Sequence, residues 1–141
     1  MSTAPTDFVD LSFRTDLGLL FSRWLRSTSD AEVRLGYEAA LAVAAPHGAR
    51  YWLLDMRRRG PASLAATRWV IDTFLPRLAE YFAQPVYLAY LLSPSHLTDF
   101  APTARPAAPK AYEVALFSDE AAALHWLEHC RHAEAAPTPV L

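Results

Sequence analysis

Three short, almost wholly apolar runs, set apart by much longer connections, constrain the fold of this chain more than any other feature. They cover residues 51–56, 86–92 and 112–117. Runs of this length and composition are typical of strands that are buried on both faces of a sheet. Because a helical or long irregular connection separates each run from the next, we expect the strands to lie mainly parallel.

The segment before these runs predicts an antiparallel hairpin. Residues 8–14 alternate apolar and polar side chains, as a half-buried strand does, and residues 19–26 form a second apolar run that contains Arg23 and Arg26. Residues 15–18, Thr-Asp-Leu-Gly, have turn chemistry. So short a connection requires the two strands to run antiparallel.

Two shorter helices are marked by their first residues. Ser29 and Glu32 form a capping box before residues 30–45, where Gly36 borders the apolar face and permits close approach to a sheet. A final helix is expected over residues 119–129. We expect its cap to be Ser118, with Asp119 and Glu120 at its positive N-terminal end.

The longest helical pattern runs through residues 63–82. Its apolar stripe consists of Leu64, Thr67, Ile71, Phe74, Leu75, Leu78 and Phe82. Pro76 lies inside the pattern on the opposite side, which predicts one helix with a bend. The side chains expected to be most deeply buried in the whole domain are Leu54, Ile71, Leu78, Leu88 and Leu127.

These elements predict one α/β domain with a mixed, mainly parallel sheet of five strands, an antiparallel N-terminal strand and about three helices. A chain of 141 residues is long enough for one such domain. We expect the domain to span residues 8–132, with tails at 1–7 and 133–141. The Pro-rich residues 98–110 predict a mobile loop, with room for a short helix.

Composition excludes several classes of protein. A net charge of −2 offers no basic field for nucleic acid, and a single cysteine forms neither an intrachain disulfide nor a Cys-based zinc site. The longest apolar run, residues 86–92, is far shorter than the ~20 residues of a membrane helix. The first ten residues lack the pattern of a signal peptide. We therefore expect a cytoplasmic protein without membrane insertion.

The order of elements, with residues 52–59 (WLLDMRRR) and 117–127 (FSDEAAALHWL), resembles the STAS or SpoIIAA-like family. That family includes anti-sigma-factor antagonists and cytoplasmic parts of anion transporters, so the resemblance implies a non-enzymatic, stand-alone bacterial binding or regulatory module. It spans roughly residues 8–130. The counterpart of the serine phosphorylated in the antagonists is Ser63, although the family's Asp-Ser-Ser/Thr-Gly run is absent here. A looser grouping with lipid-binding CRAL-TRIO domains implies, as the alternative, a small lipid or anionic-metabolite carrier.

Polar side chains gather where two of the predicted strands end, which is the edge at which open α/β sheets bind ligands. The candidate binding residues are Asp55, Arg57, Arg58, Arg59, Ser63, Ser93, Ser95 and His96. Guanidinium groups beside a helix N-terminus are suited to anions, so we expect an anionic small molecule or a protein partner here. The alternative is a solvated loop in which the arginines pair with Asp55 or nearby carboxylates.

Catalytic, metal-binding and cofactor-binding motifs are not found, so we expect no enzyme, no metal and no cofactor. Ser93, Ser95, His96 and Asp99 have the residue types of a small hydrolase, which is the third alternative. His125, His129 and His132 share one helix face, and we expect that face to be solvated rather than to bind a metal.

A second candidate surface lies on the outer side of the long helix. Its residues are Trp69, Ala65, Ala66, Thr73 and Pro76. Small neighbours around an aromatic ring let another surface approach closely, which favours a homodimer or a protein partner at this face. The alternative is a Trp69 ring that lies flat over the flank of its own helix.

Overall fold

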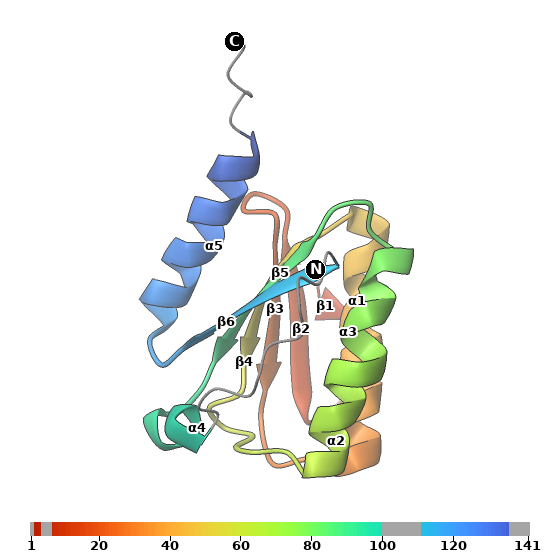
Figure 1. Ribbon diagram of the computed structural model, residues 1–141, viewed down its shortest axis with the longest axis vertical. Helices are drawn as coiled ribbons and strands as arrows, with labels where there is room; N and C mark the ends of the chain where they lie inside the picture. Colours follow the sequence, from red (N-terminus) through yellow and green to blue (C-terminus); the bar gives the residue numbers. More distant parts are fainter. Residues whose placement is uncertain (1, 4–6, 100–110, 136–141) are drawn as a thin grey trace.

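The computed structural model describes residues 2–3, 7–99 and 111–135, which form one sheet with helices on both faces (Figure 1). The strands, in their order across the sheet, are β1 (Ser2–Thr3), β2 (Val9–Arg14), β3 (Leu19–Trp24), β4 (Tyr51–Asp55), β5 (Val86–Leu91) and β6 (Tyr112–Phe117). The helical elements are α1 (Asp30–His47), α2 (Leu64–Trp69), η1 (Val70–Phe74), α3 (Leu75–Arg77), η2 (Leu78–Glu80), α4 (Pro94–Asp99) and α5 (Glu120–Ala135).

The predicted α/β fold is confirmed. β2 and β3 form the expected antiparallel hairpin, and each strand from β3 to β6 pairs in parallel with the next. The short β1 pairs with β2 from within the segment expected to be a tail. The last two residues of α4 are the first two of the stretch expected to be a loop, residues 98–110. Residues 100–110 of that stretch lie outside the described residues.

Alternating side chains of β4 supply two separate cores. Trp52 and Leu54 point to the face covered by α1 and the α2–α3 segment, whereas Leu53 points to the face covered by α5, where it meets Leu127. All of these side chains are fully buried. Successive residues of a strand point to opposite faces, so a strand buried on both faces must be apolar throughout.

In the first half of the long helical segment, the buried side chains are not the predicted ones. The buried side chains are Ala66, Val70, Phe74, Leu75, Leu78 and Phe82. Leu64 is 70% exposed and Ile71 is 38% exposed, so their predicted burial is wrong. From Phe74 onward the buried positions match the predicted stripe, whereas Ala66 and Val70 each lie one residue before the predicted Thr67 and Ile71.

The cause is the π-helical turn η1. The N–H group of Leu75 donates to the carbonyl of Val70, five residues earlier, which adds one residue to that turn of helix. An added residue shifts the face presented by everything before it. Pro76 follows directly and has no N–H group, so the regular hydrogen-bond ladder is broken here in any case. The single bent helix predicted over residues 63–82 is therefore a chain of four short helical elements.

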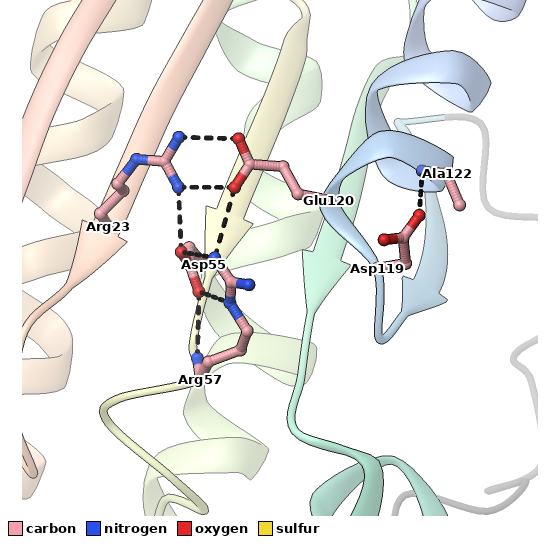
Figure 2. A network of polar contacts seen from close by, with 6 residues as sticks. All are labelled: Arg23, Asp55, Arg57, Asp119, Glu120 and Ala122. Carbon is pink, nitrogen blue, oxygen red and sulfur yellow. Dashed lines mark hydrogen bonds and ion pairs between the residues drawn. The ribbon is translucent and has the colours of Figure 1, made fainter.

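Helix ends follow local chemistry with one correction. The capping box of Ser29 and Glu32 is present, and α1 ends at Gly48, whose φ of 60° is left-handed. At the start of α5 the predicted cap, Ser118, is wrong. The carboxylate of Asp119 accepts from the N–H group of Ala122 at 2.9 Å, so Asp119 is the cap (Figure 2). α5 continues to Ala135, beyond its predicted end and into the segment expected to be a tail.

None of the helices in the described part of the chain is both long enough and apolar enough to cross a membrane.

Candidate functional site

A group of four charged side chains lies where β3 and β4 end, on the face of the sheet covered by α5 (Figure 2). We call Arg23, Asp55, Arg57 and Glu120 the charge cluster. Arg23 and Asp55 are register partners in adjacent strands, so their side chains leave the same face. Nη1 of Arg23 donates to Asp55 at 2.9 Å and to Oε1 of Glu120 at 3.1 Å, and Nη2 donates to Oε2 of Glu120 at 3.1 Å. The cluster thus ties the ends of two strands to the first turn of α5.

Asp55 is the most buried member of the charge cluster. Its carboxylate accepts from the backbone N–H group of Arg57 at 3.1 Å and from Nε and Nη2 of that side chain at 3.0 and 2.8 Å. Burial raises the pKa of Asp55, but the hydrogen bonds and charge of Arg57 outweigh burial, so the pKa lies below its ordinary value. Arg57 also reaches Glu120 at 3.3 Å. Two guanidinium groups face two carboxylates, and the charge cluster is neutral.

Arg59 lies on the other face of the sheet, over Trp24, which follows Arg23 and so points the opposite way. Its Cζ atom is 5.0 Å from the centroid of the Trp24 ring. Arg59 is only 9% exposed. Nε donates to the carbonyl of Gly60 at 3.3 Å, whereas Nη1 is buried without a hydrogen-bond partner. Among the described residues no carboxylate forms an ion pair with Arg59, in contrast to Arg57.

Two phenols lie close to Arg59. The hydroxyl groups of Tyr37 on α1 and Tyr90 on β5 are 2.7 Å apart, so one donates to the other, whose own proton stays available for a further acceptor. Burial raises the pKa of both tyrosines, and the positive charge of Arg59 lowers each pKa without offsetting burial. Both phenols are therefore neutral near pH 7, and neither compensates the charge of Arg59.

We call Arg59, Trp24, Tyr37 and Tyr90 the Arg59 site. It combines a buried cation, a phenolic donor and an aromatic face. A group that completed it would have to accept hydrogen bonds and carry negative charge, as a carboxylate or phosphate does. Within the described residues no group of three or more potential metal ligands gathers.

The predicted binding residues are only partly brought together. Arg58 is exposed, and Arg57 and Arg59 point to opposite faces of the sheet. Ser63 caps α2 by accepting from the N–H group of Ala66 at 3.0 Å, and it donates to Asp30 at 2.7 Å. Its hydroxyl therefore has a structural partner on each side.

The turn before α4 is held by its own hydroxyl groups. The side-chain oxygens of Ser93 and Ser95 are 3.5 Å apart, and the N–H group of His96 donates to Ser93 at 3.4 Å. His96 is buried. The serines make no hydrogen bond to the arginines in the described part of the chain.

Trp69 packs within its own chain. Its ring lies 6.3 Å from the ring of Tyr37 and 5.7 Å from that of Phe74, and the guanidinium of Arg34 lies over it at 5.6 Å. Ala66, placed on the outer face by the sequence, is buried, because the helix is rotated before η1. Ala65, Thr73 and Pro76 are exposed as predicted. Trp69 thus packs between its own helical segment, through Phe74, and α1, through Tyr37 and Arg34.

The predicted solvated face of α5 is present, since His125, His129 and His132 are all exposed. Cys130 is partly buried and packs with the core beneath α5.

The sequence pointed to Arg57, Arg59 and Asp55, which pairs with Arg57 as the alternative prediction had it, but not to the other residues around the two arginines. The partners that it missed are Arg23, Trp24, Tyr37, Tyr90 and Glu120. A charged Arg23 inside an apolar strand was a usable signal, because parallel pairing of β3 with β4 sets it opposite Asp55. The two tyrosines give no such signal, since each has the spacing of an ordinary core residue.

Comparisons of the chain with protein-family models, with curated proteins and with solved structures gave no significant match.

Proposed function

We propose that this chain is a non-enzymatic binding or regulatory module of the STAS-like kind, and that the Arg59 site binds an anion. The anion belongs to a small molecule or to a protein partner. The observation that carries the proposal is the buried guanidinium of Arg59, which has an unpartnered Nη1 and forms no ion pair with the described residues. An unpaired buried charge costs several kcal/mol, which an anion at this position would offset.

The surroundings of Arg59 support binding rather than catalysis. They consist of hydrogen-bond donors and an aromatic face, and burial keeps the two phenols protonated. Nucleophilic catalysis would need an activated nucleophile beside a base. The place of the site supports the proposal as well, because ligands of open α/β sheets bind at the carboxyl ends of the strands. The antiparallel hairpin followed by parallel strands is consistent with a STAS-like module.

The proposal is tested by thermal unfolding of the full chain in rising concentrations of sodium sulfate and sodium acetate. Ionic strength is held constant with sodium chloride. A ligand that binds only the folded state stabilises it by about 2.7 kcal/mol at a hundred times its dissociation constant. We expect a saturable rise in the melting temperature for wild type with at least one of the two anions, and none for Arg59→Gln.

Arg68→Gln is the matched control, because Arg68 is exposed on α2. It should keep the wild-type response. Equal stabilisation of wild type and Arg59→Gln would contradict the proposal, since it would reflect general exclusion of salt from the surface. Native mass spectrometry of the purified chain tests the carrier alternative at the same time, because a retained lipid adds its mass to the protein.

A further inference from the structure

Building on the anion site proposed above, we infer that the Arg59 site selects a group with a single negative charge, a carboxylate, over a dianion such as sulfate or a phosphate monoester.

The Arg59 site differs from the charge cluster in its net charge. Arg59 contributes one positive charge to its face of the sheet. Arg23 and Arg57 lie on the opposite face, where Asp55 and Glu120 neutralise them. Arg58 is exposed to solvent. The two phenols beside Arg59 are neutral, because burial keeps them protonated. The Arg59 site therefore presents a single uncompensated positive charge.

A ligand whose charge does not match that of the Arg59 site binds at a cost, because the site is buried. One carboxylate brings the charge of the site to zero. A dianion would leave one negative charge unpaired beside the buried side chains of Trp24 and Tyr37, and an unpaired charge is costly where water is excluded. On the exposed surface the same mismatch would cost little, because water and salt screen it.

The free hydrogen-bond donors of the Arg59 site suit the two oxygens of a carboxylate. Nε of Arg59 donates to the carbonyl of Gly60. The buried Nη1 has no acceptor among the described residues. The hydroxyl groups of Tyr37 and Tyr90 lie 2.7 Å apart, so one donates to the other. The proton of the accepting hydroxyl is free for a further acceptor. A guanidinium donor and a phenol donor match the two oxygens of a carboxylate.

The test is a titration of the ¹⁵N-labelled full chain with sodium acetate and, separately, with sodium sulfate, at neutral pH and constant ionic strength. The readout is the amide of Gly60 and the indole N–H of Trp24 in two-dimensional NMR spectra. We expect both signals to shift saturably with acetate. The dissociation constant for acetate should be about ten-fold below that for sulfate, which corresponds to about 1.4 kcal/mol.

Three variants sharpen the test. Arg59→Lys keeps one charge but loses the planar fork, so affinity for acetate should fall while acetate stays preferred over sulfate. Arg59→Gln should lose binding of both anions. Arg58→Gln should match wild type, and a loss of binding there would overturn the charge count.

The outcomes separate the inference from the function on which it rests. If sulfate binds as tightly as acetate or more tightly, the inference is wrong while the anion site stands. If neither anion shifts Gly60 or Trp24, both are wrong. A preference for acetate that persists in Arg59→Gln would also overturn the inference, because some other group would be responsible.

Discussion

The indole of Trp24 lies so close to Gly36 that a Cβ atom at position 36 would meet the ring atom Cη2 at 2.3 Å. α1 can therefore pack against β3 only because residue 36 has no side chain, as the sequence predicted. The same ring lies under the guanidinium of Arg59. One contact in the core thus fixes the aromatic face of the Arg59 site.

Gly36→Ala is accordingly expected to lower the free energy of unfolding by about 1–3 kcal/mol, the usual cost of overpacking. Chemical denaturation measures this directly. Leu35→Ala on the same helix is the control and should change stability little, since Leu35 is 61% exposed. Equal effects of the two substitutions would show that the Trp24–Gly36 contact is not tight.

The rotation of the long helical segment at η1 is tested by a pair of truncations. Leu78→Ala should cost about 2–5 kcal/mol, because Leu78 is fully buried and its loss leaves a cavity. Ile71→Ala should cost much less, because Ile71 is 38% exposed. Denaturant melts of both variants provide the comparison. A larger loss for Ile71→Ala than for Leu78→Ala would restore the regular stripe predicted from the sequence.

Asp55→Asn should destabilise the chain in a pH-dependent way. Arg57 holds the pKa of Asp55 below its ordinary value in the folded protein despite burial. Its contribution is therefore present above the unfolded pKa, about 3.9, and is lost as pH falls through the lower folded pKa. Removing one partner of a buried pair costs about 3 kcal/mol. The difference from wild type should be largest at neutral pH and should shrink in acid.

The control for that series is Asp16→Asn. Asp16 pairs with Arg14 on the surface, and its side chain is 61% exposed. No measurable change is expected there, because exposed ion pairs contribute little. A stability difference for Asp55→Asn that stayed constant from neutral pH to strong acid would count against the charge cluster as its source.

Trp69→Glu distinguishes packing within the chain from a dimer contact. The ring of Trp69 packs on Tyr37 and Phe74. Placing a carboxylate there should lower the free energy of unfolding by about 2 kcal/mol, without a change in sedimentation coefficient. A wild-type dimer that this substitution converts into a folded monomer would instead assign Trp69 to a homodimer interface.

The far end of α5 is held by Glu134, which accepts from Arg50 at 2.7 Å and from Tyr51 and Tyr87. Burial raises the pKa of Tyr87 to about 12, with the charge of Glu134 acting in the same direction. Glu134→Gln is expected to lower stability by about 1 kcal/mol. Glu128→Gln alters only contacts on the helix surface, with the neighbouring Arg131 and His132, and should have a smaller effect in the same melts.

The sheet was predictable because the signals that produce it are local. The apolar runs of β4 and β5, the turn before β3 and the capping box at Ser29 each act over a few residues. Leu54, Leu78, Leu88 and Leu127 are buried as predicted. Ile71 is not, because a single π-helical turn rotates the helix, and hydrophobic spacing alone carries no sign of such a turn.

What the sequence determined by itself was the position of the strands along the chain, their directions and the edge at which charged residues collect. Only the tertiary structure decided which arginine is neutralised. Arg23 meets Glu120 from 97 residues away because strand register and the start of α5 bring the two side chains together. Arg57 and Arg59 are two residues apart, yet one meets carboxylates and the other an indole and two phenols. Pairing depends on atoms within a few ångströms of each other, and the fold alone sets those distances.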